Sequence, residues 1–185
     1  EANGNVKIKD TINKYVIFSD KITYLKNKNI IITNGNSRAI EEDSNITIKA
    51  NKFEYYKLEN KILASENVVI NNNVKDYKIF SDKIEYFKNQ EKFITHGFTR
   101  ALIESNYDIK SSDVIFFKDK LELFSKKDTT IFDNNFQFYK LSKFNYSINK
   151  KELKGEKIIV TTNYNLPKSD KFYFSSAIID LKNNN

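Results

Sequence analysis

An internal repeat of about 31 residues constrains the fold of this chain more than any other feature. Residues 15–27, YVIFSDKITYLKN, align without a gap with YKIFSDKIEYFKN, 62 residues later. The six-residue core of this segment recurs in steps of 31, 31, 31, 29 and 28 residues, starting at Ser19, Ala50, Ser81, Ser112, Leu141 and Ser169. Such a period is typical of folds that stack similar units. About six copies cover nearly the whole chain, so we expect residues 1–185 to form a single domain.

Each unit contains two β-strands according to its hydrophobic pattern. Around Phe18, Ile22 and Tyr24, apolar side chains alternate with polar ones, which is the period of a half-buried strand. A polar turn follows at 26–29, and then a second strand such as 30–40. No stretch keeps a helical period over ten residues. The sequence therefore predicts an all-β chain of stacked antiparallel two-strand units, with about twelve strands and almost no helix.

Stacking is required because a two-strand unit cannot bury its apolar face alone. Two architectures satisfy this requirement, an elongated jelly-roll of two facing antiparallel sheets and a parallel β-helix. Strands joined by short polar turns pair antiparallel, which favours the jelly-roll.

Composition narrows the possible functions. The chain has no cysteine, so it forms neither disulfides nor thiolate metal sites. The net charge is +7, but the lysines are scattered among acidic and amide residues, and we predict no nucleic-acid partner. No apolar run approaches the roughly 18–20 residues of a membrane span. If the protein is exported, its signal peptide is absent from this sequence.

The repeated aspartates are the first candidate site. They are Asp20, Asp82, Asp113 and Asp170, and a ladder of carboxylates could bind a metal or cleave a glycosidic bond. However, the same position holds Asn51 and Ser142 in two other units. These residues keep the hydrogen bonding and lose the charge, so we expect backbone caps at the starts of strands. We predict no catalytic residue, no metal ligand and no cofactor.

Three further polar residues have two interpretations each. His96 is the single histidine, lacks a catalytic partner at a recognisable spacing, and is expected in an exposed turn. Arg38 and Arg100 are the two arginines and occupy the same phase of the repeat. Arginine binds phosphate and carboxylate bidentately, so the pair could hold anions. Alternatively, each arginine forms an outward salt bridge with a neighbouring acid.

The apolar stripe of the repeat is the remaining candidate. Its side chains either fill a packed core or line a groove between two sheets that opens for acyl chains. The candidate lining residues are Ile22, Tyr24, Phe53, Tyr55, Val68, Ile70, Ile84, Tyr86, Ile115, Phe117, Phe144 and Tyr146.

The repeat motif resembles that of a known family. Residues 50–55, ANKFEY, followed by 62–70, ILASENVVI, are similar to the pattern of the OstA superfamily of lipopolysaccharide-transport proteins. Segments 112–114, 130–133 and 153–155 look most like the amino-terminal periplasmic domain of the LptD family of outer-membrane assembly proteins. The resemblance covers the whole chain, although its motifs are short and degenerate.

The resemblance implies a fold, a function and partners. The expected fold is a twisted, open β-jelly-roll in the periplasm of a Gram-negative bacterium, associated with the outer membrane. The expected function is non-enzymatic: the domain accepts the acyl chains of lipopolysaccharide in its hydrophobic groove and passes them to the assembly barrel. The implied partners are lipopolysaccharide, an LptA-type bridge protein that pairs through an edge strand, and the outer-membrane β-barrel with its plug lipoprotein.

Other functions remain open from the sequence. LptD-family domains carry cysteines that this chain lacks, so a free LptA-like bridge protein is one alternative. A structural β-solenoid with a solid core is another. A carbohydrate-active β-helix enzyme would need paired carboxylates, which the replacements at the aspartate position disfavour.

Overall fold

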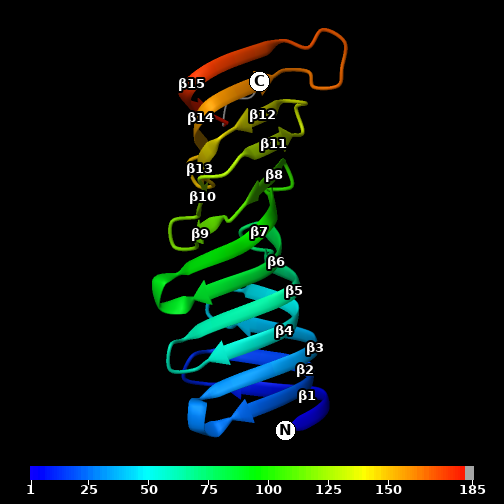
Figure 1. Cartoon of the computed structure of the whole chain (residues 1–185), viewed down its shortest axis with the longest axis vertical. Coiled ribbons are helices and arrows are strands. Elements are labelled where there is room, and N and C mark those ends of the chain that lie inside the picture. Colours follow the sequence, from blue (N-terminus) through cyan, green and yellow to red (C-terminus); the bar gives the residue numbers. More distant parts are fainter. Residues whose placement is uncertain (182–185) are drawn as a thin grey trace.

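The computed structural model describes residues 1–181 as a long stack of β-strands, with β1 and β15 at opposite ends of the stack (Figure 1). The strands are β1 (Ala2–Asp10), β2 (Tyr15–Leu25), β3 (Ile30–Glu41), β4 (Ile46–Tyr56), β5 (Lys61–Asn72), β6 (Tyr77–Phe87), β7 (Lys92–Ile103), β8 (Tyr107–Ser112), β9 (Ile115–Phe117), β10 (Glu122–Ser125), β11 (Thr129–Asp133), β12 (Phe138–Leu141), β13 (Lys143–Ser147), β14 (Glu152–Thr161) and β15 (Lys171–Asp180). Two 3-10 turns, η1 (Lys26–Lys28) and η2 (Lys88–Gln90), are the helical segments of this described part. Within it, no helix has the length and hydropathy needed to cross a bilayer. The all-β prediction is confirmed.

The strands form one antiparallel sheet whose order follows the chain from β1 to β8. After β7 the sheet divides, because β8 pairs with the second half of β7 while β9 pairs with its first half. One branch continues through β11 and β12, and the other through β10 and β13. Both branches rejoin on β14, which pairs with β15. The structure has fifteen strands, more than the twelve predicted, because three of the expected long strands are interrupted and form the pairs β8–β9, β10–β11 and β12–β13.

Each long strand contributes to two half-sheets because it bends near its middle. The register shifts at this point in every pairing from β1–β2 to β6–β7. We call half-sheet A the part that contains β8, β11 and β12 and the strand ends in line with them. Half-sheet B contains β9, β10, β13 and the opposite strand ends. Side chains from both half-sheets form one buried apolar cluster along the stack, which is the jelly-roll arrangement.

Positive backbone φ angles produce the bends. In every second strand the bend holds a residue in the left-handed region, and these residues follow each other at intervals of 31: Gly4, Gly35, Glu66 and Gly97. Glycine adopts this conformation without steric cost, whereas other residues do so reluctantly. Three of the four glycines of the chain therefore have a structural explanation at the bends.

Buried hydroxyl groups satisfy the backbone at the bends. Ser19 donates to the carbonyls of Asn34 and Gly35, with Oγ–O distances of 3.0 and 2.9 Å. Ser81 makes the equivalent bond to His96 at 3.4 Å. A carbonyl that leaves the ladder at a bulge would otherwise be buried without a donor.

Two of the four repeated aspartates occupy positions that differ from the prediction, whereas Asp113 and Asp170 lie just before β9 and β15, as expected. Asp20 and Asp82 lie within β2 and β6, at the bends, so the prediction of caps at strand starts is wrong for them. The strand continues through this position as a bulge, which the alternating pattern did not indicate. Asp20 Oδ2 accepts from the side-chain amide of Asn36 at 2.8 Å, while Asp113 Oδ1 accepts from the backbone N–H of Gly97 at 2.9 Å.

Candidate functional site

The apolar interior is the candidate site, and most of the predicted lining residues lie in it. Nine of the twelve are at most 2% exposed: Ile22, Phe53, Tyr55, Val68, Ile70, Ile84, Tyr86, Phe144 and Tyr146. Rings stack along this interior, for example Tyr86 on Phe93 with centroids 3.9 Å apart. Each large apolar side chain contributes about 1.5–3 kcal/mol on burial.

Two predicted lining residues point away from the interior. Ile115 and Phe117 are only partly buried, and Val114 and Phe116 fill the interior instead, at 2% and 1% exposure. This corrects the prediction by one residue. The cause is the interruption between β8 and β9, where Asp113 has a φ of 50° and the strand resumes in shifted phase.

Tyr24 faces inward but is 44% exposed. Its cross-strand partner is Ile31, which is buried, so the two side chains share the inner face. Its hydroxyl donates to the side chain of Asn29 at 3.2 Å. The residues of the same phase in the next two units, Tyr55 and Tyr86, are fully buried because earlier strands cover them.

Buried tyrosines connect the two half-sheets through carboxylates. Tyr55 donates to Asp10 Oδ2 at 3.2 Å, and Tyr86 donates to Glu41 Oε1 at 3.0 Å. Both pairs are 45 residues apart in sequence. Burial and the neighbouring carboxylates raise the pKa of both phenols above the ordinary value, so the tyrosines stay neutral donors.

Ion pairs close the side of the jelly-roll opposite the bends. We call this side the seam; there the turns of half-sheet B approach the turns of half-sheet A. Lysines from half-sheet B turns contact acids at the ends of half-sheet A strands. The pairs are Lys57 with Asp10 at 3.6 Å, Lys88 with Glu41 at 3.2 Å, Lys118 with Glu41 at 2.9 Å and Lys151 with Glu104 at 3.0 Å.

Glu41 is the centre of the seam. Its side chain is 2% exposed and accepts hydrogen bonds from Tyr86, Lys118 and Ser44. Burial opposes ionisation, but the bonds from Ser44 and Lys118 and the charges of Lys118 and Lys88 outweigh it. The pKa of Glu41 therefore lies below its ordinary value, and the carboxylate is charged at neutral pH.

Two of the seam acids, together with an asparagine, follow the repeat, which the sequence reasoning missed. Asp10, Glu41 and Asn72 end the alternate strands β1, β3 and β5 at intervals of 31 residues. Asp10 Oδ1 accepts hydrogen bonds from the backbone N–H groups of Ile12 and Asn13. Asn72 Oδ1 accepts in the same way from the backbone N–H groups of Val74 and Lys75, in the turn after β5. The spacing was visible in the sequence, since these residues precede polar turns in the same phase.

Among residues 1–181, the C-terminal end of the interior is open. An apolar pocket of about 750 Å³ lies between β12, β14 and β15. On β15, Phe172 and Phe174 pair with inward-facing residues of β14 yet remain 49% and 44% exposed. The pocket's apolar lining residues are Tyr139, Val160, Phe172, Phe174, Ala177, Ile178 and Ile179. We call this opening the mouth.

The other polar candidates have different surroundings. His96 lies within β7 and not in the exposed turn that was predicted, and its Nε2 bonds Glu85 Oε1 at 2.9 Å on the outer face. Arg100 forms a bidentate ion pair with Asp108, whereas the guanidinium of Arg38 lies over the ring of Phe18 at 4.5 Å. Among residues 1–181, no group of three or more histidine, cysteine or acidic side chains could hold a metal ion.

Comparison with known proteins supports the fold. No protein-family model matches the chain, and no curated protein matches it. A solved structure does: LptH from Pseudomonas aeruginosa, described as the LptA-homologous periplasmic component of the lipopolysaccharide transport device. The identity is 11% and the TM-score is 0.55, over 63% of this chain and 84% of that chain. The chain therefore has an LptA-like all-β fold.

Proposed function

We propose that this protein is a non-enzymatic carrier that holds the acyl chains of lipopolysaccharide in its interior, as a single periplasmic domain spanning residues 1–185. The observation that carries the proposal is the mouth, where a core that runs the length of the stack ends in an open apolar pocket. The likeness in fold to a periplasmic lipopolysaccharide-transport component supports it.

The physical requirement for such a carrier is simple. Each CH₂ group of an acyl chain kept from water contributes about 0.8 kcal/mol. A lipid with several acyl chains therefore crosses an aqueous space only inside an apolar conduit. The twelve predicted lining residues are proposed to supply that conduit, with Val114 and Phe116 in place of Ile115 and Phe117 in the fourth unit.

Loading requires the seam to open, because side chains fill the interior. The bends connect the half-sheets covalently on one side, so separation takes place on the other side, at the ion pairs. Lys57 is 31% exposed and Lys118 is 13% exposed, so water reaches these cations as they leave their carboxylates. Acyl chains would then replace the contacts between facing tyrosine and phenylalanine rings.

The terminal strands define the proposed protein partners. β1 pairs with β2 alone and β15 with β14 alone, so each leaves one edge unpaired among the described strands. An exposed edge accepts a strand from another protein. A bridge protein of the LptA type is the proposed partner at an edge. A role at the outer membrane, as in LptD-type assembly proteins with their barrel and plug lipoprotein, is a finer version of the same proposal.

The second candidate function is a structural β-solenoid with a solid core. The complete burial of Tyr55, Phe93 and Tyr86 favours it, since these rings occupy the space that acyl chains would need. In that case the mouth is only the uncovered end of a stack.

Photo-crosslinking from neighbouring positions of β15 separates the two functions. We would place benzoylphenylalanine at Phe174, which lines the mouth, or at Tyr173, which pairs with the outward-facing Ile159 and is 70% exposed. The purified variants are irradiated with lipopolysaccharide and with a deacylated form of it.

The carrier function predicts adducts at Phe174 with the acylated lipid alone and little labelling at Tyr173. Equal labelling of both positions, or no adduct at Phe174, contradicts it and leaves the solid-core function.

A further inference from the structure

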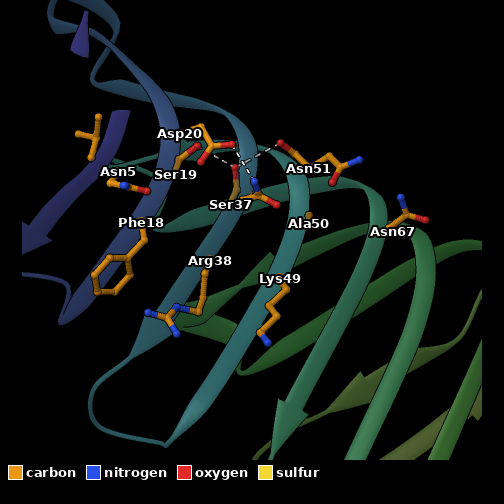
Figure 2. A pocket seen from close by; sticks show the side chains of 12 residues that line it. Asn5, Phe18, Ser19, Asp20, Ser37, Arg38, Lys49, Ala50, Asn51 and Asn67 are labelled. Carbon is orange, nitrogen blue, oxygen red and sulfur yellow. Dashed lines mark hydrogen bonds between the residues drawn. The ribbon is translucent and has the colours of Figure 1, made fainter. Parts of the chain in front are cut away.

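A pair of like charges without a counter-ion lies on the outer face of half-sheet A. Arg38 and Lys49 are directly opposite each other on β3 and β4. Figure 2 shows the two side chains next to each other on the neighbouring strands. Like charges in this arrangement destabilise a sheet. Among residues 1–181, no carboxylate lies within ion-pair distance of either side chain.

The repeat contains the same arrangement with its charge balanced. Phe80, Arg100 and Lys110 face each other on β6, β7 and β8 as Phe18, Arg38 and Lys49 do on β2, β3 and β4. There, Asp108 neutralises both cations, at 2.8 Å from Arg100 and 3.7 Å from Lys110.

The structural equivalent of Asp108 in the first pair is uncharged. Asp108 precedes Lys110 by two residues on β8 and pairs with Leu102 of β7. Thr47 precedes Lys49 by two residues on β4 and pairs with Ile40 of β3, so it occupies the equivalent position. One copy of the repeat therefore carries its own anion, and the other lacks it. The difference leaves the positive charges of Arg38 and Lys49 available to an external anion.

The unbalanced pair borders an open pocket of about 510 Å³. Figure 2 shows the two cations toward one end, with Asp20 and Asn51 nearer the bend. The pocket is lined in addition by the amides of Asn5, Asn36 and Asn67. Carboxylate and amide groups accept and donate hydrogen bonds to hydroxyl groups, whereas the carboxylate would repel a second anion.

We propose that this pocket binds a phosphorylated sugar, with the phosphate on Arg38 and Lys49 and the hydroxyl groups toward Asp20 and the asparagine amides. The planar guanidinium of Arg38 offers a bidentate contact and is held in place by the ring of Phe18. Lys49 adds a point charge. The site is on the outer surface and does not depend on the proposed carrier function.

Calorimetric titration of the intact chain tests the site, with glucose 6-phosphate as the probe and glucose and inorganic phosphate as comparison ligands. We expect glucose 6-phosphate to bind most tightly and glucose not to bind measurably. Arg38→Gln should weaken binding by at least about tenfold, since a hydrogen bond to a charged group is lost. Arg100→Gln is the matched control and should leave the affinity unchanged.

Two exchanges within the repeat sharpen the test. Thr47→Asp supplies the missing carboxylate without removing a cation, and it should abolish binding. Asp108→Thr removes the counter-ion of the second pair, and it should add a second, weaker site. Circular dichroism and urea unfolding verify that each variant is folded.

Three outcomes would overturn the proposal: no binding of glucose 6-phosphate, equal losses in Arg38→Gln and Arg100→Gln, or unchanged binding in Thr47→Asp. Titration with lipopolysaccharide micelles then identifies the natural source of the phosphate. If Thr47→Asp loses affinity for the micelles, the phosphate comes from a lipid headgroup. If its affinity for the micelles is unchanged, the natural ligand is a free sugar phosphate. Crosslinking at Phe174 tests the carrier function and does not depend on these titrations. The carrier proposal and the sugar-phosphate proposal can therefore fail separately.

Discussion

At the residue scale, Glu41 shows how one position of the repeat acquires a special role. Its equivalents Asp10 and Asn72 have shorter side chains that cap their own turns. Glutamate is one methylene longer than aspartate, and Glu41 extends to two lysines and a tyrosine of half-sheet B. A buried carboxylate must be paired to remain charged. The seam is therefore strongest at this residue.

Acid should weaken the seam. The pKa values of Glu41 and Asp10 lie below their ordinary values of 4.5 and 3.8, so both residues bind protons more weakly in the folded protein than in the unfolded chain. Their stabilisation is complete above those ordinary values and is lost as the pH falls through the folded-state pKa values. We expect the free energy of unfolding to fall below about pH 4.5 and to fall less steeply in Glu41→Gln, as measured by urea unfolding. An identical pH profile in the variant would contradict this assignment.

Removal of one phenolic oxygen measures the link between the half-sheets. Tyr86→Phe loses the hydrogen bond to Glu41, which is buried and charged, and should cost about 1.5–3 kcal/mol of unfolding free energy. Tyr24→Phe is the matched control because its hydroxyl bonds an exposed asparagine, and it should change stability by less than about 0.5 kcal/mol. Equal effects in the two variants would rule out a special role for the buried bond.

At the element scale, the bend within each long strand makes the jelly-roll possible. The apolar alternation predicted strands on both sides of the bend and the polar turns between them, because period and turn chemistry are local properties. It did not reveal the bend, since a bulge adds one residue without changing the residue types around it. The glycines at 31-residue and 62-residue intervals were the available signal. For the same reason the shifted phase of Val114 and Phe116 was not predictable.

Two glycine substitutions test the bends. A Cβ at Gly97, with φ +78°, would meet nothing within 4 Å, so Gly97→Ala should cost only the left-handed strain of about 1–2 kcal/mol. A Cβ at Gly35, with φ +81°, would lie 3.1 Å from Asp20 Cβ and 2.6 Å from its Oδ2. We therefore expect Gly35→Ala to lower the urea midpoint further. The opposite order would show that the bend of β3 differs from the one described.

At the scale of the whole molecule, the two half-sheets are offset along the stack. Residues that bond each other across the interior, such as Tyr55 and Asp10 or Tyr86 and Glu41, are 45 residues apart in the sequence, so each unit is covered by strands of earlier units. Stability then arises from contacts between neighbouring units, as in other repeat proteins. The sequence predicted the stack and nine of the interior residues because the repeat defines both. It indicated Arg38 as an anion-binding candidate but revealed neither the ion pairs of the seam nor the pairing of Arg38 with Lys49, since these contacts form only in the three-dimensional register.

The central claim is that the filled interior opens at the seam to admit acyl chains. Lys88 Nζ donates to the carbonyl of Asn13 across the seam at 2.6 Å. Because the chain contains no cysteine, Asn13→Cys and Lys88→Cys allow a bifunctional maleimide to lock this position alone. The same protein carries benzoylphenylalanine at Ile84, which is fully buried.

The measurement is the yield of lipopolysaccharide adduct at Ile84 before and after the seam is locked. We predict a clear adduct in the unlocked protein and its loss in the locked one, with the outward-facing Glu85 unlabelled in both. An adduct that persists after locking, or none in either form, would contradict the claim.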